Sequence, residues 1–329
     1  MNLRIIKAGV QDTIQDMGRI GWQHLGINPG GAMDKVAAAM ANILVGNAPR
    51  EAVIEMNFPA SEFFFEQPAL VAVSGADFSM HVNGEEIASD HPVLLSKFSI
   101  LQFHRINKGA RAYLAVHGGF DLQGWLNSCS THLKAAMGGF QGRALEKDDE
   151  IPMRLRKELC PMISNKEYIV LPWKTEPELP ESDPATVFIL PGNEWERLEG
   201  QSKNILVDHS FVITHQSDRM GYQLKGEKLM TNQQEEVVSS AVNFGTLQLL
   251  PDGQLIVLMA DHQTAGGYPR VAHVISAHHS RLAQMKPGQM IRFQFTDIQV
   301  AEDLLLRQQK HLLQLQNACH LKLDNFLKQ

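Results

Sequence analysis

Residues 70–103 read LVAVSGADFSMHVNGEEIASDHPVLLSKFSILQF, a series of short apolar runs that end at Gly, Pro, Asn or Asp. Runs of this kind are typical of β-strands bounded by turns. The pair Asn83-Gly84 predicts a type I′ hairpin turn, because both central positions of that turn need positive φ. Similar runs recur along the chain, and we expect strands at 70–73, 78–82, 92–95, 99–103, 110–116, 186–190, 211–213, 246–249, 254–258 and 290–295. The chain is therefore predicted to be mainly β, in the α+β class.

Two segments show helical periodicity instead. Residues 32–45 place Met33, Val36, Met40 and Leu44 on one stripe, and Gly46-Asn47 supplies a stop, so we expect a helix that packs on a sheet. Residues 299–329 carry leucines among Gln, Lys and His, which predicts a long C-terminal amphipathic helix. This helix packs either on its own barrel or against a partner or second copy.

The length of 329 residues predicts two domains, and 44% apolar residues are enough to build a core in each. We expect an N-terminal domain at 1–160 and a β-barrel domain at 186–298, followed by the helix at 299–329. Residues 161–185 are rich in Pro, Glu and Lys and lack periodicity, so they are predicted to be the linker.

Composition excludes several classes of protein. The net charge is -6, with 30 basic and 36 acidic residues, which disfavours binding to nucleic-acid phosphates. Three cysteines far apart in sequence can form neither a disulfide framework nor a four-thiolate zinc site, so we expect the cytoplasm. No apolar run approaches the roughly 18 residues of a membrane-spanning helix, and no signal peptide is apparent.

The sequence also lacks several catalytic motifs. There is no H-E-x-x-H among the 14 histidines, so no metal site is expected. The phosphate loop G-x-x-x-x-G-K-[ST] and the nucleophile elbow G-x-S-x-G are absent as well. Neither self-sufficient nucleotide hydrolysis nor serine-esterase chemistry is indicated.

The stretch TIQDMGRIGWQHLGINPGGAMD, residues 13–34, combines polar side chains with five glycines. Glycines allow the backbone to approach a ligand closely, so Gln15, Asp16, Arg19 and His24 are candidate binding residues. The alternative is structural: Asp16 and Arg19 brace the loop by pairing, and Asp34 caps the following helix.

The stretch SDRMGYQLKG, residues 217–226, places Ser217, Asp218, Arg219 and Tyr222 in a polar turn. An Arg guanidinium commonly binds a carboxylate, and a Tyr side chain can donate a hydrogen bond to a ligand or stack on it. The alternative is a buried structural Arg–Asp pair.

The stretch MADHQTAGGYP, residues 259–269, follows an apolar strand. Polar groups at a strand end are well placed for binding, which makes candidates of five residues: Asp261, Gln263, Thr264, Gly266 and Gly267. A tight turn explains the glycines but not the polar side chains.

The stretch NSCSTHLKAAMGGFQGRAL, residues 127–145, contains the consecutive glycines Gly138 and Gly139. Their backbone N–H groups could face an oxyanion, and the alternative is a plain glycine turn.

Taken together and in order, these blocks resemble one family. The blocks are TIQDMGRIGWQHLGINPGGAMD, LVGN (44–47), SGADF (74–78), AYLAVHGGFD (112–121), MGGFQGRAL (137–145), LPGN (190–193), SDRMGYQLKG and IVLMADHQTAGGYPRVAHVISA (256–277). They resemble the carboxyltransferase-domain family, which includes the 5-oxoprolinase C subunit, KipA-like proteins and part of urea carboxylase. The resemblance covers residues 1 to about 295, although His132 and Ala265 depart from the Asp and Thr that the family has there, and MNFPASEF (56–63) replaces a glycine-containing segment.

This resemblance implies a two-domain, cyclophilin-like β-barrel architecture with a few helices. It also implies an ATP-dependent 5-oxoprolinase that opens 5-oxoproline to L-glutamate, in which this chain works beside a KipI-like B subunit, together with a LamB/YcsF-like A subunit. ATP is expected to bind to the complex rather than necessarily to this chain. Arg219, Asp261 and Tyr222 are the expected catalytic residues. Substrate-binding residues lining the same cleft are expected at Gln15, Asp16, Arg19, His24, Ser217, Asp218, Gln263, Thr264, Gly266, Gly267, Gly138 and Gly139.

Two other functions stay open at this point. One is a biotin-dependent carboxyltransferase acting on urea or another amide, which needs a biotin carrier that this chain lacks. The other is a KipA-like regulator that binds a KipI-like kinase inhibitor, for which only a partner surface is required.

Overall fold

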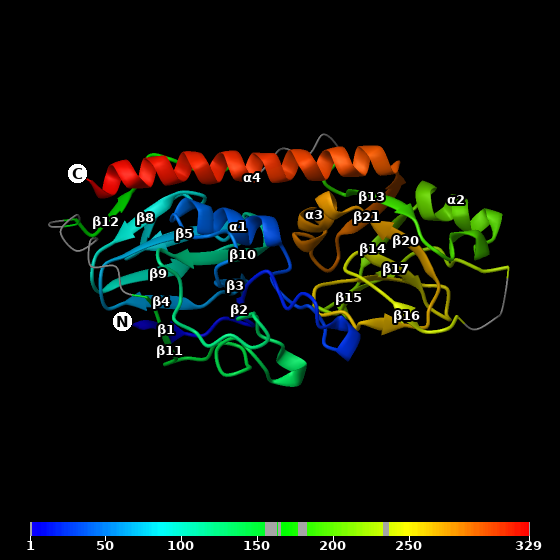
Figure 1. Cartoon of the computed structure of the whole chain (residues 1–329), viewed down its shortest axis with the longest axis horizontal. Coiled ribbons are helices and arrows are strands. Elements are labelled where there is room, and N and C mark those ends of the chain that lie inside the picture. The colour runs from blue at the N-terminus through cyan, green and yellow to red at the C-terminus, as the bar shows by residue number, and fades with distance from the viewer. Residues whose placement is uncertain (1, 155–162, 164–165, 177–182, 233–236, 329) are drawn as a thin grey trace. The chain divides into compact units, whose positions relative to one another are not determined.

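The computed structural model describes residues 2–154, 163, 166–176, 183–232 and 237–328 (Figure 1). They fall into two compact units. Unit 1 is drawn from Met1–Arg19, Asp34–Glu178 and Lys310–Gln329, and unit 2 from Ile20–Met33 and Leu179–Gln309. Residues 161–162, 164–165 and 177–182 of the predicted linker at 161–185 lie outside the described residues, and Tyr168–Val170 within it forms strand β12. The described chain is mainly β with four α-helices, which confirms the predicted fold class.

Unit 1 contains two six-stranded antiparallel sheets. In spatial order the first sheet consists of β11 (Glu150–Pro152), β1 (Asn2–Lys7), β4 (Glu62–Phe65), β9 (Ser99–Phe103), β6 (Met80–Val82) and β7 (Glu85–Glu86). The second consists of β12 (Tyr168–Val170), β8 (Pro92–Leu95), β5 (Ala69–Asp77), β10 (Lys108–Val116), β3 (Val53–Asn57) and β2 (Thr13–Gln15). The hairpin between β6 and β7 turns at Asn83 and Gly84, whose φ values are 51° and 86°, as predicted.

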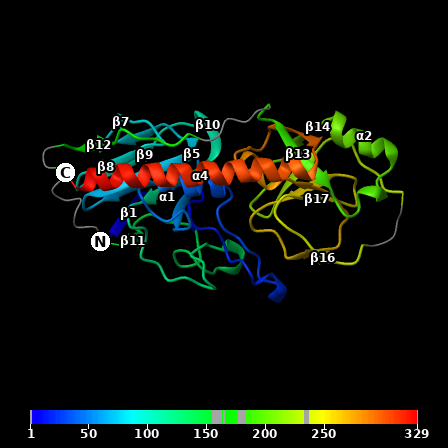
Figure 2. The same ribbon diagram turned by 45° about the horizontal axis from the view of Figure 1, so that its top comes forward.

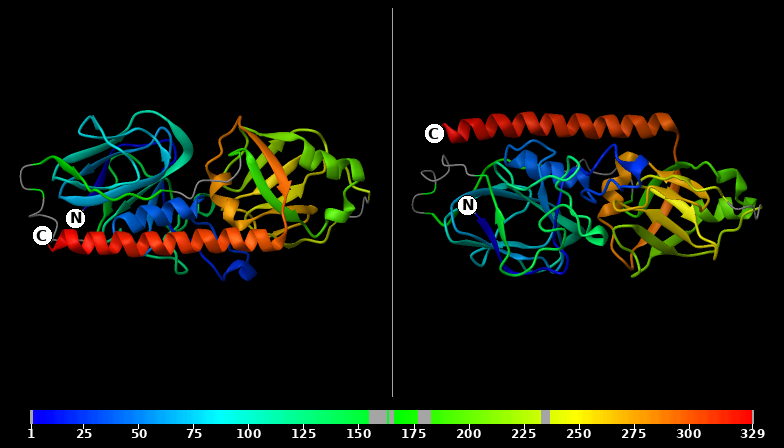
Figure 3. Two further views of the ribbon diagram at one scale, coloured as in Figure 1. Left: turned by 90° about the horizontal axis from the view of Figure 1, so that it is seen from above. Right: turned by 60° about the horizontal axis from the view of Figure 1, so that its bottom comes forward.

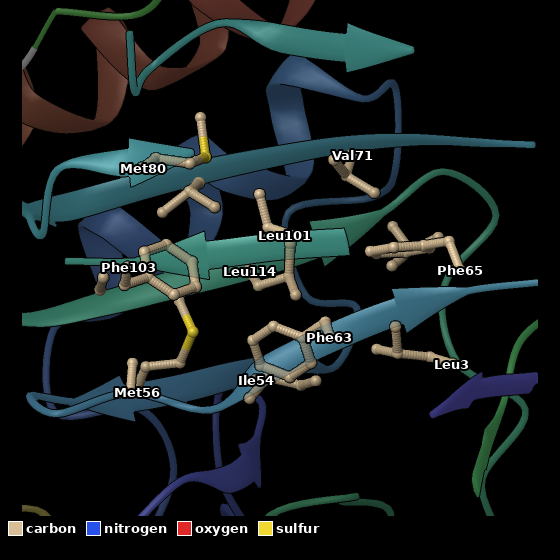
Figure 4. Close-up of a cluster of buried hydrophobic side chains, with 14 of the residues drawn as sticks. Leu3, Ile54, Met56, Phe63, Phe65, Val71, Met80, Leu101, Phe103 and Leu114 are labelled. Carbon is tan, nitrogen blue, oxygen red and sulfur yellow. The ribbon is translucent and has the colours of Figure 1, made fainter. Parts of the chain in front are cut away.

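The core of unit 1 lies between these sheets. Side chains from both sheets meet in one cluster, shown in Figure 4, with Leu3, Phe63 and Leu101 from the first sheet and Ile54 and Leu114 from the second. Strand β9 alternates buried and partly exposed residues because its outer face meets solvent. The first six residues of β5 are all buried, because α1 (Lys35–Leu44) packs on the other face of its sheet (Figure 2).

Local signals fix both ends of α1. Asp34 is the N-cap, and its Oδ1 accepts a hydrogen bond from Ala37 N at 3.0 Å, as the structural alternative in the sequence predicted. The chain leaves the helix at Gly46, whose φ is 72°. A Cβ at Gly46 would overlap the Cδ2 methyl of Leu323 in α4 (Ile298–Leu327), so a larger residue at position 46 would have to displace that side chain. Phe326 packs edge-on against Trp173 nearby, with ring centroids 6.3 Å apart.

Helix α4 confirms the predicted C-terminal helix, and only part of its surface is buried. Cys319 and Leu323 are buried in unit 1, whereas Leu306, Leu313 and Leu321 are exposed. None of the helices in the described residues is long and apolar enough to cross a membrane.

Unit 2 is built on a closed seven-stranded barrel (Figure 3). The closure order is β13 (Thr186–Pro191), β20 (Arg270–Val274), β17 (Thr246–Leu249), β18 (Leu255–Leu258), β15 (Gly221–Lys225), β14 (Ser210–Ile213) and β21 (Met290–Phe295). Alternate residues point inward, as with Ile291 and Phe293 of β21. A short ribbon, β16 (Ser240–Ala241) with β19 (Ala265–Gly266), lies outside the barrel. Helices α2 (Gly200–Asp208) and α3 (His279–Ala283) complete the unit.

His278 ties α3 to the barrel through a hydrogen bond that needs a neutral ring. Its Nδ1 accepts from Phe188 N at 2.9 Å, and its ring lies 4.7 Å from the ring of Phe188. Burial, aided by the nearby charges of Arg281 and His279, lowers the pKa of His278 from 6.5 to about 4.

We expect unit 2 to lose stability as the pH falls from about 6.5 towards 4. In that window the unfolded state binds a proton at His278 and the folded state does not, so unfolding is favoured by about 2 kcal/mol between pH 7 and pH 5. Hydrogen exchange of the barrel amides at these two pH values measures the change. The control is His278→Gln, which keeps an acceptor but cannot titrate there, and its barrel should show a shallower pH dependence. Equal slopes for both proteins would refute this role of His278.

Candidate functional site

Unit 1 contains a polar cluster around Asp16, at the end of β2. Oδ1 of Asp16 accepts hydrogen bonds from Ser128 Oγ at 2.7 Å, Ser130 Oγ at 2.6 Å and Gly18 N at 2.7 Å. Its Oδ2 accepts from Cys129 N at 2.5 Å, and its own N–H donates to Ser130 Oγ at 2.9 Å. The side chain is buried, and these four donors occupy both oxygens. Asp16 therefore shapes the 128–130 turn.

Arg19 lies on the other side of the same turn. Its residue exposure is 1%, its Nη2 donates to the carbonyl of Ser130, and its Cζ lies 4.7 Å from the ring centroid of Trp125. Asp16 and Arg19 both bind Ser130, so both brace this loop, which is the structural role that the sequence alternative gave them.

Gly138 and Gly139 pack directly on this turn. Their φ values are 69° and 57°, and a Cβ at either position would overlap Ser130, Arg19 or Thr131. Close approach, and not only turn geometry, therefore requires glycine here.

Gln15 completes the cluster. Its Nε2 donates to Thr13 Oγ1 at 3.0 Å and to the carbonyl of Thr131 at 3.2 Å. Its Oε1 is buried and has no hydrogen-bond partner among the described residues. The structure thus brings together, in unit 1, five of the predicted site residues: Gln15, Asp16, Arg19, Gly138 and Gly139.

A second polar network holds the start of α1 in unit 1. The N–H of Asp34 donates to Tyr113 Oη at 2.8 Å, and that hydroxyl donates to Glu55 Oε2 at 2.9 Å. All three residues are buried, and burial beside Glu55 raises the pKa of Tyr113 well above its usual value. Sequence reasoning missed this network because Tyr113 and Glu55 stand inside apolar strands.

In unit 2 the central feature is the pair Arg219–Asp261. Arg219 Nε donates to Asp261 Oδ2 at 2.8 Å, and Nη2 donates to Oδ1 at 3.1 Å and to the carbonyl of Gly31 at 2.6 Å. Both side chains are about 10% exposed. Asn28 Nδ2 donates to the carbonyl of Asp261 at 3.1 Å. This fork holds the 28–31 segment on the barrel. It is a buried Arg–Asp pair, as the structural alternative for residues 217–226 predicted.

Tyr222 does not belong to this pair. It is 2% exposed, its ring lies in the barrel core, and its hydroxyl lies 3.4 Å from the carbonyl of Met285. We therefore correct the expectation that it meets a ligand. Position 2 of β15 points into the barrel, as Leu224 does two residues later.

The turn before β15 is built by its own polar residues. Asp218 Oδ1 accepts from Met220 N at 2.7 Å and from Gly221 N at 3.2 Å. Ser217 Oγ accepts from Gln223 N at 3.0 Å. These are local side-chain-to-backbone turns, which account for Asp and Ser at these positions without a ligand.

The residues after β18 lie over β17. Gln263 Nε2 donates to Gln248 Oε1 at 3.4 Å, and a Cβ at Gly266 would lie 2.6 Å from Gln248 Nε2. The carbonyl of Thr264 accepts from Val242 N at 3.2 Å, and Gly267 follows β19. Sequence reasoning missed Gln248, a fully buried amide whose neighbours in β17 gave no polar signal.

His24 and the predicted shared cleft are the last two expectations about the site. His24 lies exposed in the 3₁₀ turn Gln23–Leu25. The expectation that the residues of unit 1 and those of unit 2 line one cleft stays a prediction. Among the described residues, no group of three or more His, Cys, Asp or Glu side chains has the arrangement of a metal site.

In unit 2 a closed barrel thus holds the glycine-rich segment 28–31 through an Arg–Asp fork, and unit 1 is built from two sheets. The family model described as "Carboxyltransferase domain, subdomain A and B" matches residues 25–295, so the chain belongs to that family.

Individual proteins match more of the chain than this family model does. The chain is 35% identical to the 5-oxoprolinase C subunit of Haemophilus influenzae over 94% of this chain and 96% of that protein. It is 33% identical to the 5-oxoprolinase C subunit of Escherichia coli over 95% of this chain and 97% of that protein. Among solved structures, the K. lactis urea amidolyase superposes with a TM-score of 0.85 at 24% identity. That match covers 95% of this chain but only 20% of the amidolyase, and it shows the shared fold.

Proposed function

We propose that this chain is the C subunit of an ATP-dependent 5-oxoprolinase, which hydrolyses 5-oxoproline to L-glutamate. The observation that carries this proposal is the end-to-end similarity to two proteins named as the C subunit of 5-oxoprolinase, which leaves only a few per cent of either protein unmatched. The urea amidolyases at 25–26% identity share only 16–17% of their length with this chain.

The names of these two relatives describe one part of a larger enzyme, which supports an assembly with other chains. We propose that the partners are a KipI-like B subunit, together with a LamB/YcsF-like A subunit, and that the complex works in the cytoplasm. Because this sequence contains no phosphate loop, we assign ATP binding to the complex rather than to this chain alone.

A lactam is a poor electrophile, so the reaction needs activation of the amide oxygen. Phosphoryl transfer from ATP to that oxygen releases ADP and makes the ring carbon electrophilic. Water then adds to this carbon, a proton moves from the added water to the nitrogen as the C–N bond breaks, and a second water hydrolyses the resulting acyl phosphate to L-glutamate and phosphate. Such a site needs donors for the developing oxyanion and a group that holds the carboxylate. The glycine turn at 138–139 and the Arg19 cluster are the features of unit 1 that suit these tasks.

The test is co-expression of this chain with its KipI-like and LamB-like partners. We expect ATP-dependent release of glutamate from 5-oxoproline only when all three chains are present, and none when any one is omitted. A well-folded complex without turnover would overturn the proposal.

The same preparation distinguishes the other two functions. Carboxylation of urea or another amide by a co-purifying biotinylated protein, detected with avidin, would indicate a carboxyltransferase. Tight binding of the KipI-like protein without turnover would indicate a regulator.

A further inference from the structure

The loop at 137–143, called here the glycine loop, carries a run of N–H groups that the protein leaves open. Gly142 N donates to Gly138 O at 2.9 Å and Arg143 N to Phe140 O at 3.4 Å. The N–H groups of residues 138, 139, 140 and 141 have no hydrogen-bond partner among the described residues. Residues 138–140 are half-buried and Gln141 is exposed, so this part of the loop meets solvent.

The conformation of the glycine loop suits an anion. φ is positive at Gly139, not positive at Phe140 and positive again at Gln141, where it is 57°. Changes of sign of this kind turn successive N–H groups to one side and form a concave anion site. A positive φ at the non-glycine Gln141 is a strained conformation, of the kind that is retained where it serves a ligand.

Contacts on both sides hold the glycine loop in place before any ligand binds. On one side the two glycines pack on Ser130 and Thr131. On the other, Arg143 donates to both oxygens of Asp149 at 2.7 Å and to Gln141 Oε1 at 3.1 Å. A loop held in this way binds an anion without a large loss of conformational entropy.

A buried cation stands behind the glycine loop. Arg19 Nη2 lies so close to Gly138 that a Cβ there would overlap it. Because Arg19 is 1% exposed, its charge is poorly screened by water and adds a positive potential at the neighbouring N–H groups.

From these observations we infer that the N–H groups of residues 138–141, backed by Arg19, bind the carboxylate of the lactam substrate; this inference rests on the proposed function. The shared chemistry of the site is that of an oxyanion, which a phosphate group also offers. We assign the site to a carboxylate because the proposed substrate carries one, and the titration below distinguishes it from a phosphate group.

The direct test is titration of the full ¹⁵N-labelled chain, observing the amide resonances of residues 138–141. Three probes are added separately: 5-oxoproline, the neutral lactam 2-pyrrolidinone, and inorganic phosphate. We expect saturable shifts with 5-oxoproline and none with 2-pyrrolidinone. Equal or larger shifts with phosphate would assign the site to a phosphate group and overturn the carboxylate inference, as would an absence of shifts with all three.

The second test uses the assembled complex and the variant Arg19→Met. We expect KM for 5-oxoproline to rise about tenfold with little change in kcat, and any turnover of 2-pyrrolidinone to be unaffected, because only the carboxylate interaction weakens. Arg19→Lys should restore part of the loss. The matched control is Arg154→Met, which removes a half-exposed charge paired with Glu51 and should leave KM unchanged.

The two hypotheses fail separately. If the complex does not open 5-oxoproline but the amides still respond to it and not to 2-pyrrolidinone, the proposed function is wrong and the carboxylate site stands. If the complex is active but KM is insensitive to Arg19→Met and the amides do not shift, the site is wrong and the function stands.

Discussion

Replacing Arg219 by Met is expected to lower the free energy of unfolding of unit 2 by about 3–5 kcal/mol. The change leaves the buried carboxylate of Asp261 without its two donors and the carbonyl of Gly31 without its partner. Breaking a buried pair by removing one member is strongly destabilising because the remaining charge is desolvated without compensation. The loss is measured by urea unfolding, with hydrogen exchange of the barrel amides as the probe.

Two further variants show whether the pair itself is responsible. The double variant Arg219→Met with Asp261→Leu removes both charges and is expected to cost less than Arg219→Met alone. The half-exposed pair Arg154–Glu51 is the matched control, and Arg154→Met should cost below about 1 kcal/mol. An Arg219→Met protein as stable as the Arg154→Met protein would contradict our interpretation.

This interpretation changes how activity data on Arg219 are read. Loss of turnover in an Arg219 or Asp261 variant does not by itself identify a catalytic group, because the same pair holds the 28–31 segment on the barrel. A role of Arg219 or Asp261 in binding or catalysis can be assigned only from a variant whose barrel amides keep their protection against hydrogen exchange.

Replacing Asp16 by Ala is expected to destabilise unit 1 by about 3–5 kcal/mol. Four hydrogen bonds disappear at once, and their donors are buried or half-buried around the 128–130 turn. Asp16→Asn should cost about half as much, since its single carbonyl keeps the bonds now made by Oδ1 while its amide group faces the N–H of Cys129. Urea unfolding of the three proteins gives the ranking.

The matched control for Asp16 is Asp218→Ala. Asp218 also accepts two backbone N–H groups, but it is exposed, so water can replace the lost bonds and the effect should be less than half as large. An Asp16→Ala protein no less stable than the Asp218→Ala protein would show that the 128–130 turn does not need the carboxylate.

Much of the fold follows from local patterns. The segments 92–95, 99–103, 246–249 and 290–295 are strands with the predicted bounds, because each is a short apolar run ended by turn residues. Strands such as β3 were missed because Glu55 interrupts the apolar run, and its burial depends on the hydroxyl of Tyr113 in the neighbouring strand.

The candidate site was predictable only in part. The glycine-rich stretches at 13–34 and 127–145 do lie together in unit 1, but three of the four donors to Asp16, in residues 128–130, lie more than 100 positions away in sequence and no local pattern identifies them. Tyr222 was assigned to the site because it follows a polar turn. Tyr222 and Leu224 lie two residues apart in β15 and so share one face of the strand, and this spacing was the signal for a core position.

The contact between Gly46 and Leu323 has a consequence for biosynthesis. A ribosome makes the chain from its N-terminus, so α1 and the sheets of unit 1 emerge long before the last turns of α4 that pack beside Gly46 and Trp173. Unit 1 can complete its packing only after synthesis has passed Phe326, so its folding ends with a contact between segments that are far apart in sequence.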